Sequence, residues 1–306
     1  MGVKMKVCIY GLWHLGLVTA SCLSAKGFNV IGLDENYNSI NTTIKTLPIY
    51  EPNLKESIEK SAITFTNDKD FALNQTKIIW ITFDTPVDKY DNANNEYVMN
   101  KVRDIFPYIK KDSLVIISSQ LSVGTTRKLQ NEYNLSYPDM NITFSYSPEN
   151  LVRGKAIEGF NNPDRIIIGI NNNGSDIKNN TKVNDFFMQI FDCKNVRYMS
   201  LESAEMVKHS LNSFLALSIS FANEVAQICE KVEANYEDVE FALKSDLRIG
   251  KKAYLRAGEA YFGGTLGRDV NYLRTISMKT SSTTPVIDSI NLSNLLHKER
   301  IQEKTK

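Results

Sequence analysis

A glycine-containing loop near the N-terminus carries residues suited to binding a phosphate group. The loop runs from Gly11 to Gly16 after a short apolar segment and reads Gly-Leu-Trp-His-Leu-Gly. In a G-x-G-x-x-G fingerprint the first glycine makes a tight turn, the second lets the backbone approach a pyrophosphate, and the third lets helix and strand pack closely. The first and third glycines are present, but Trp13 stands at the middle position. We expect its indole to obstruct the usual pyrophosphate path unless the side chain swings outward.

Two further polar residues, Asp34 and His14, bear on what this loop would bind. Asp34 ends the next predicted strand, where a carboxylate can bond a ribose 2′-hydroxyl and would repel a 2′-phosphate. The loop therefore predicts NAD rather than NADP as the cofactor. His14 could bond a phosphate, although a solvent-facing or helix-capping role is an equally good interpretation. The alternative for the whole loop is a Rossmann scaffold that keeps the turn and has given up the cofactor.

The segments around this loop predict a Rossmann-type α/β fold. Lys6–Tyr10 and Phe28–Leu33 are short apolar segments typical of buried strands, and residues 15–25 between them have helical spacing. Such a strand–helix–strand unit builds a parallel sheet. Further strand-like segments alternate with helical ones: Ile78–Phe83, Leu114–Ser118, Ile142–Phe144, Arg165–Ile170 and Val196–Met199. This alternation predicts a doubly wound, mostly parallel sheet in a dinucleotide-binding domain over residues 1–200.

The pattern becomes mainly helical after residue 200. Leu201–Val232 is a long segment without proline or glycine, which predicts one uninterrupted helix. Shorter helical segments follow at Tyr236–Lys244, Asn271–Lys279 and Pro285–Gln302, with a glycine-containing loop between residues 250 and 269. We therefore predict a second, helical domain over residues 201–306.

The composition excludes several classes of protein. The 306 residues carry a net charge of +1, whereas nucleic-acid-binding proteins usually have a strong basic excess to match phosphate. No apolar run approaches the length of a membrane span, and the N-terminus lacks the features of a signal peptide. The four cysteines are scattered without metal-ligand spacing, which favours free thiols in a reducing compartment. We expect a cytoplasmic protein with no metal site and no nucleic-acid or membrane partner.

A series of short motifs follows one another along most of the chain: Pro48–Leu54, Asp84–Pro86, Val123–Thr126, Ser147–Leu151, Asn162–Ile166, Ala204–Lys208, Ser220–Glu224 and Arg248–Gly250. In type and order they resemble the motifs of the UDP-glucose/GDP-mannose dehydrogenase family, the nucleotide-sugar 6-dehydrogenases. This collinearity is more specific than any single motif. The resemblance implies NAD as cofactor, a sugar nucleotide or sugar phosphate as substrate, and a homodimer formed through helix 201–232.

The resemblance also implies roles for individual residues. Lys208 and Asn212 match the family's catalytic lysine and asparagine, and their i, i+4 spacing places them on one helix face. In isolation, a surface lysine and a capping asparagine would be the better interpretation of this pair. Glu149 and Asp269 match two further active-site carboxylates. The implied cofactor-binding residues are Gly11, Trp13, His14, Leu15, Gly16, Asp34 and Thr85, and the implied substrate-binding residues are Arg248, Tyr254, Leu255, Arg256 and Gly263.

Departures from the family pattern fall on its second oxidation step. The family captures the aldehyde with a cysteine, but Thr265 stands at that position when residues are counted back from Asp269 without a gap. If the two glycines of the loop are aligned instead, one residue is missing. A threonine hydroxyl is a far weaker nucleophile than a thiolate, and Gln120 replaces the threonine associated with the hydrolytic water. The family also implies a further nucleotide-binding domain, which these 306 residues do not include.

Two functions from different classes fit these observations. The first is an NAD-dependent oxidoreductase that performs a two-electron alcohol/carbonyl step on a nucleotide-linked or phosphorylated sugar, or on a smaller hydroxy acid, rather than full oxidation to the acid. The second is a catalytically inactive homologue that acts as a binding or scaffold protein, which Trp13, Thr265 and Gln120 favour. The selective retention of first-step residues such as Lys208 and Asn212 favours the enzyme.

Overall fold

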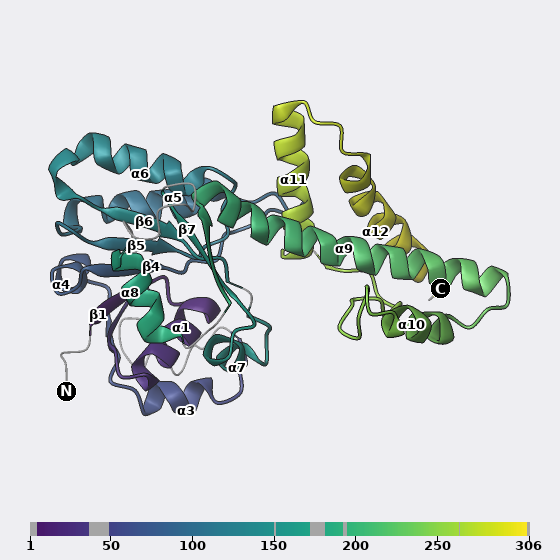
Figure 1. Ribbon diagram of the computed structural model, residues 1–306, viewed down its shortest axis with the longest axis horizontal. Coiled ribbons are helices and arrows are strands. Elements are labelled where there is room, and N and C mark those ends of the chain that lie inside the picture. The colour runs from purple at the N-terminus through teal and green to yellow at the C-terminus, as the bar shows by residue number, and fades with distance from the viewer. Residues whose placement is uncertain are drawn as a thin grey trace. The chain divides into compact units, whose positions relative to one another are not determined.

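The computed structural model describes residues 5–36, 49–149, 151–171, 181–191, 195–262 and 264–304 (Figure 1). The chain divides into two compact units. Unit 1 consists of Met1–Pro86 and Asn94–Met206, and unit 2 consists of Val87–Ala93 and Val207–Lys306. The short segment Val87–Ala93 therefore belongs to the same unit as the C-terminal helices, although unit 1 flanks it on both sides in sequence.

Unit 1 contains an eight-stranded sheet in the order β3-β2-β1-β4-β5-β6-β7-β8. All neighbouring strands are parallel except β6 and β7, which meet at Tyr146 and Gly169 in an antiparallel pair. The predicted Rossmann-type, mostly parallel α/β fold is thereby confirmed. The strands are β1 (Lys6–Tyr10), β2 (Asn29–Leu33), β3 (Thr64–Thr66), β4 (Ile78–Ile81), β5 (Leu114–Ile117), β6 (Thr143–Tyr146), β7 (Ile166–Ile170) and β8 (Val196–Ser200).

Helices cover both faces of this sheet, which explains why its strands are apolar on both sides. In Figure 1, α1, α3, α7 and α8 lie on one face, and α5 and α6 lie on the other. Trp80 of β4 packs edge-on against Phe186 and Phe187 of α8, with 5.9 Å between ring centroids in each pair. The helical segments are α1 (His14–Ala25), α3 (Leu54–Glu59), α4 (Lys69–Leu73), α5 (Asn95–Asp104), η1 (Phe106–Tyr108), α6 (Thr125–Ser136), η2 (Pro138–Met140), α7 (Ala156–Asn161) and α8 (Thr181–Ile190).

Unit 2 is helical, as predicted. Its elements are most of α9 (Leu201–Lys231), followed by α10 (Tyr236–Ser245), α11 (Leu266–Thr280) and α12 (Pro285–Lys304). A small core joins α9, α11 and α12 through Ala216, Val270 and Ile290, with Tyr261 packed against them. The backbone of Tyr261 is held from both sides by Asn294, whose Oδ1 accepts from Tyr261 N and whose Nδ2 donates to Tyr261 O, each at 3.0 Å.

The start of α11 differs from the sequence-based expectation. Glycines at 264 and 267 predict a loop as far as Asp269, but the helix begins at Leu266 and Asp269 lies in its first turn. Gly264 has a φ of +83°, so it ends the loop in a conformation that glycine adopts without strain, and the helix follows directly. A carboxylate in the first turn also interacts favourably with the helix dipole.

Neither the described helices nor the described cysteines contradict what the sequence predicts of them. Within the ranges given above, no helix is both long and apolar enough to cross a membrane. Cys8, Cys22 and Cys229 are buried and free, and burial raises the pKa of the Cys8 and Cys22 thiols, which makes both poorly reactive. Cys193 lies outside the described residues.

Candidate functional site

The turn between β1 and α1 has a geometry that requires glycine at two positions. Gly11 has a φ of +97°, and a Cβ added there would lie 2.8 Å from the Phe83 ring. A Cβ on Gly16 would lie only 1.9 Å from the carbonyl oxygen of Gly11, so α1 can approach β1 only because residue 16 has no side chain. These are the conformational roles that a dinucleotide fingerprint assigns to its first and third glycines.

Trp13 is the residue immediately before α1. Its backbone is extended (φ −79°, ψ −161°), and its side chain, which is partly buried, lines a cavity of about 340 Å³. The cavity lies at the carboxyl ends of β1, β2 and β4, where open α/β sheets bind their ligands. The residues that line it are Tyr10, Trp13, Asp34, Glu35, Asn36, Phe83, Asp84, Pro86, Tyr97 and Lys101.

Asp34 connects the glycine turn to this cavity. The carboxylate is 7% exposed; Oδ2 accepts from Leu12 N at 2.7 Å, and Oδ1 accepts from Asn36 N at 2.9 Å. Leu15, in the first turn of α1, is half-buried. Tyr10 also lines the cavity, and its hydroxyl is buried without a hydrogen-bond partner in the described part of the chain.

A lysine–glutamate pair and two aromatic rings form another wall of the cavity. Lys101 of α5 pairs with Glu35, and its hydrogen bond holds the pKa of that carboxyl below its usual value. The Lys101 ammonium also lies 5.7 Å from the ring centroid of Tyr97. Tyr97 in turn meets Phe83 edge-on at 6.2 Å. The cavity therefore combines flat apolar surfaces with charged groups at its rim, as nucleoside pockets do.

His14 is buried and paired with a glutamate, so it is not the solvent-facing residue that one interpretation of the sequence predicted. Its Nε2 lies 3.1 Å from Oε2 of Glu51, and both residues are buried. Glu51 also accepts from the backbone nitrogens of Gly154 and Ala156, each at 2.8 Å. Burial alone would raise the pKa of Glu51, but these three hydrogen bonds lower it on balance. The pair joins the start of α1 to the turn before α7, which neither interpretation of His14 from the sequence foresaw.

Thr85 and Glu149 both belong to unit 1. The Thr85 hydroxyl is 2% exposed and donates to the carbonyl of Gln120 at 2.6 Å, so it connects the segments that follow β4 and β5. Glu149 follows β6 and is half-buried. Gln120 itself is buried, at 8% exposed.

In unit 2 the structure brings Asn212 and Asp269 together. Asn212 Nδ2 donates to Asp269 Oδ2 at 2.5 Å, while Nδ1 of His209 lies 2.6 Å from Asp269 Oδ1. His209 and Asp269 are both fully buried, and the His209 ring lies 4.4 Å from that of Tyr272. Lys208, half-buried, is the neighbouring residue on α9. His209 was not predicted, because a single histidine in an apolar helix gives no signal of its own.

The start of α11 contains Thr265 and a carboxylate from the Val87–Ala93 segment. Thr265 occupies the N-cap position, is exposed, and makes no side-chain capping bond. Oδ1 of Asp91 instead accepts from the backbone nitrogen of Gly264 at 2.7 Å. A Cβ on Gly267 would lie 2.8 Å from Asp91 Oδ2, so residue 267 must be small for this carboxylate to fit. Gly263 lies outside the described residues.

The predicted substrate-binding residues of unit 2 are mostly exposed. Arg248 is exposed and pairs with Asp246, with 2.6 Å between Nη2 and Oδ2. Tyr254 is half-exposed and Arg256 is exposed. Leu255, in contrast, is buried, and its carbonyl accepts from the Tyr236 hydroxyl at 2.7 Å. The loop therefore presents cations and an aromatic ring to solvent while Leu255 anchors it.

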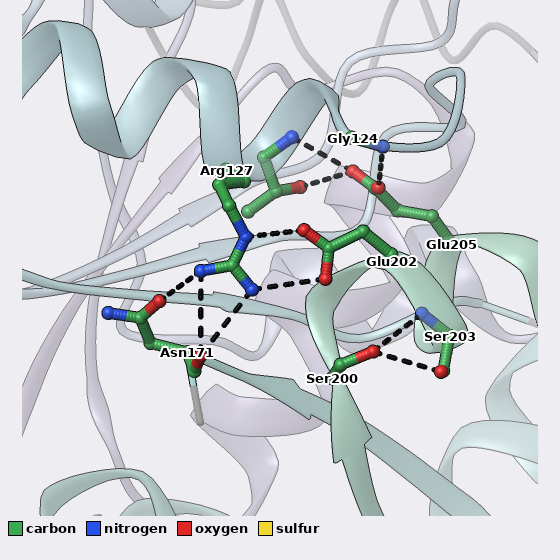
Figure 2. A network of polar contacts seen from close by, with 8 residues as sticks. Gly124, Arg127, Asn171, Ser200, Glu202, Ser203 and Glu205 are labelled. Carbon is green, nitrogen blue, oxygen red and sulfur yellow. Dashed lines mark hydrogen bonds and ion pairs between the residues drawn. The ribbon is translucent and has the colours of Figure 1, made fainter. Parts of the chain in front are cut away.

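A buried carboxylate at the start of α9 is a further feature that the sequence did not reveal. Oε2 of Glu205 accepts from Gly124 N at 2.6 Å, and Oε1 accepts from the backbone and hydroxyl of Thr126 at 2.9 and 2.7 Å. Figure 2 shows Glu205 beside Gly124, and Arg127 between Glu202 and Asn171. Burial raises the pKa of Glu205 to about 7, although the bonds from Thr126 and Gly124 act in the opposite direction.

Comparison with known proteins places these features in context. Residues 5–189 match the NAD binding domain of the UDP-glucose/GDP-mannose dehydrogenase family, and residues 202–295 match its central domain. The chain is 30% identical to a UDP-glucose 6-dehydrogenase of Rhizobium meliloti over 92% of its length, and 32% identical to UDP-glucose 6-dehydrogenase YwqF of Bacillus subtilis over 94%. It spans only 65% of the length of either relative.

Solved structures of dehydrogenases have the same fold as this chain. A UDP-glucose dehydrogenase from the hyperthermophilic archaeon Pyrobaculum islandicum superposes with a TM-score of 0.84 at 25% identity, covering 96% of this chain and 69% of that one. A 3-hydroxyisobutyrate dehydrogenase from Mycobacterium tuberculosis, at 12% identity and a TM-score of 0.67, shares the fold alone.

Proposed function

Because the chain belongs to the UDP-glucose/GDP-mannose dehydrogenase family, we propose that it is an NAD-dependent oxidoreductase acting on a CH–OH group of a nucleotide-linked or phosphorylated sugar. The reaction is a single two-electron step between alcohol and carbonyl, and it does not continue to the acid. The cytoplasmic location predicted from the sequence is part of the same proposal.

The cavity beside Asp34 supports the cofactor part of the proposal. It has room for the adenosine end of a dinucleotide and an acidic group for ribose hydroxyls. Gly11 and Gly16 keep the turn that brings the start of α1 toward a pyrophosphate. Trp13 lines the cavity beside this turn and would contact the bound nucleotide. When bound there, NAD supplies the acceptor for the hydride that leaves the substrate carbon.

The cluster of His209 and Asn212 on α9 with Asp269 on α11 supports the part of the proposal that concerns the substrate. Oxidation of an alcohol removes a hydride from carbon and a proton from oxygen, so the oxygen needs partners that stabilise its growing negative charge. Lys208 and Asn212 are such partners, an ammonium and an amide on one helix face. Asp269 accepts from the Asn212 amide and so sets its orientation before the substrate binds.

The observation that carries the single-step proposal is the start of α11. A family member that completes the oxidation captures the aldehyde with a thiol at this place, and here the residue is Thr265. The backbone N–H of Gly264 is already bonded to the Asp91 carboxylate, which would repel a thiolate or an oxyanion placed beside it. Without a thiol, the aldehyde cannot form a thioester and leaves as the product.

The stoichiometry of the reaction tests this proposal. UDP-glucose is the probe, since relatives carry it in their names, and NADH is measured by absorbance while the sugar product is identified by mass spectrometry. We expect one NADH per sugar consumed and an aldehyde product. Two NADH per sugar, with a sugar acid as product, would show that the chain completes the oxidation. Lys208→Ala, which should abolish turnover, controls for contaminating dehydrogenase.

A second part of the proposal is a homodimer formed through α9. Phe214, Phe221 and Ile228 recur every seven residues on one side of this helix and are 65%, 49% and 61% exposed. A stripe of large apolar side chains left exposed in this way marks an interaction surface. Sedimentation equilibrium should give twice the chain mass. Phe221→Glu should give a monomer, whereas Leu135→Glu, at an exposed leucine of α6, should leave the mass unchanged.

The competing function is a non-catalytic binding protein, and Trp13 is the observation that favours it. An indole at the middle position of the fingerprint, in a cavity of about 340 Å³, reduces the room for a pyrophosphate. A ligand that binds only the folded state raises its melting temperature. A melting temperature unchanged by millimolar NAD or NADH would support the non-catalytic function and contradict the enzyme.

A further inference from the structure

We propose that His209 is a positioning residue that acts through Asp269 to fix the orientation of Asn212. The inference rests on the proposed function, because Asn212 is the group that would bond the substrate oxygen. His209 is not among the residues that the family resemblance singled out. Its position in the structure is the evidence for its role.

The three side chains of this cluster are buried. His209 and Asp269 are both 0% exposed, and Asn212 is 9% exposed. An imidazole removed from water must find hydrogen-bonding partners inside the protein. His209 has such a partner in Asp269 Oδ1, at 2.6 Å, and its ring packs at 4.4 Å against Tyr272 from the next turn of α11.

Asp269 has a hydrogen-bonding partner at each of its two carboxylate oxygens. Asn212 Nδ2 donates to one oxygen of Asp269, and the other oxygen faces His209 Nδ1. Because an ionised carboxylate can only accept, His209 must carry a proton on Nδ1. The histidine is therefore a donor, and the carboxylate is held at both oxygens by residues three positions apart on α9.

The same arrangement sets the orientation of the Asn212 amide. An ionised carboxylate only accepts, so the Asn212 amide can meet it only with its NH₂ group. The second bond, to His209, holds the carboxylate against rotation. A flipped amide would place its oxygen against Asp269 Oδ2, and two acceptors at that distance repel each other. Asn212 Oδ1 is then directed away from the carboxylate. Loss of the His209 donor would remove one of the bonds that hold Asp269 and would loosen the orientation of Asn212.

Four histidine variants test the proposal. His209→Asn keeps an N–H donor close to the position of Nδ1, His209→Gln moves the donor farther along the side chain, and His209→Leu removes it. His297→Asn is the matched control, since His297 is also in unit 2 but bonds the Gly258 carbonyl. Circular dichroism and thermal melting show whether each variant is folded, and His209→Gln keeps the test valid if His209→Leu does not fold.

The expected result is a loss in kcat with little change in KM. With NAD and UDP-glucose as the probe, kcat should fall about 10- to 100-fold in His209→Leu and His209→Gln, because misplacing a catalytic group by about an ångström costs that much. We expect His209→Asn to keep kcat within about threefold of the wild type. His297→Asn should match the wild type. A folded His209→Leu or His209→Gln with unchanged kcat would overturn the proposal.

Nuclear magnetic resonance separates this proposal from the proposed function. If the wild type turns over no substrate, the proposed function has failed, and the side-chain amide resonances of Asn212 then decide the role of His209. They should shift in His209→Leu and His209→Gln but remain in place in His209→Asn and His297→Asn. Resonances of Asn212 that do not respond to any His209 variant would show that His209 does not position it.

Discussion

The starts of α1 and α11 are built alike and differ in what lies beside them. Each follows a glycine with positive φ, +97° at Gly11 and +83° at Gly264. In each, an aspartate from a distant segment accepts a backbone N–H: Asp34 from Leu12, and Asp91 from Gly264, both at 2.7 Å. Beside α1 there is a cavity of about 340 Å³, whereas at α11 the carboxylate of Asp91 packs against the first turn.

This difference bears on the proposal that the chain performs the first oxidation, of alcohol to aldehyde, but not the second, which needs a thiol. A helix N-terminus attracts anions, and an open one can serve a phosphate or a thiolate. The N-terminus of α1 keeps room for a nucleotide, and that of α11 is already neutralised by Asp91. The proposed cofactor site is thus open, while a carboxylate lies beside Thr265, the position at which the family has its thiol. Four experiments test this difference and the residues behind it.

The largest effect should come from Asp269→Asn. The new NH₂ group must face either His209 Nδ1 or Asn212 Nδ2, so a donor meets a donor in a fully buried site. We expect NADH production to fall by about 10²- to 10³-fold, as when one stabilising group of an active site is lost. Asp288→Asn, at an exposed ion pair with Arg274, should leave the rate unchanged. Equal rates for both variants would contradict a catalytic role for the cluster.

Gly16→Ala should have the next largest effect, on stability. The added Cβ would lie 1.9 Å from Gly11 O, so α1 must move away from β1. We expect the free energy of unfolding, measured in urea, to fall by about 3 kcal/mol. Gly159→Ala in α7 meets only Leu151 Cδ2, at 3.6 Å, and should change stability by less than about 1 kcal/mol. Similar values for the two variants would mean that α1 tolerates displacement.

Glu205 should make the stability of the protein depend on pH. Its pKa is raised from 4.5 to about 7, so the folded state holds the proton more tightly than the unfolded state. The contribution is therefore fully present below pH 4.5 and is lost as pH rises through about 7, amounting to about 3 kcal/mol at most. Glu205→Gln should remove this slope between those pH values. A wild type and variant with parallel pH profiles in urea unfolding would contradict the assignment.

The smallest effect should be seen in fluorescence. The chain has two tryptophans, and Trp80 is 2% exposed with its Nε1 bonded to Ser118, so it should be insensitive to ligands. Trp13 lines the cavity, and bound NAD should quench its emission partially. In Trp13→Phe the remaining emission should not respond to NAD. If both proteins respond equally, NAD does not bind beside Trp13.

The fold and the first turn could be predicted from the sequence because their signals are local. The β1–α1–β2 unit, Gly11, Gly16 and Asp34 lie within one short stretch, and the alternation of apolar segments sets the sheet class. The short strand β3, only three residues long, has too little pattern to be recognised. The start of α11 was missed because glycines at 264 and 267 resemble a loop, although one of them ends it and the other makes room for Asp91.

The contacts that define the site could not be predicted, because they join residues far apart in sequence. Asp91 meets Gly264 and His209 meets Asp269, and no motif pairs these residues. Glu205 and Thr126 each lie within a motif, but nothing in either motif predicts that the two side chains meet. Each depends on the tertiary arrangement within its unit. Family resemblance identified Asn212 and Asp269 but not the histidine that shares the same carboxylate.

The shared carboxylate of Asp269 has an evolutionary consequence. Two α9 side chains depend on one α11 acceptor, so a substitution at any of the three positions leaves buried polar groups unmatched at the others. Replacements at 209, 212 and 269 should therefore be strongly epistatic, with double mutants less harmed than the sum of the singles. A lineage that lost one of these residues would be driven to exchange all three together.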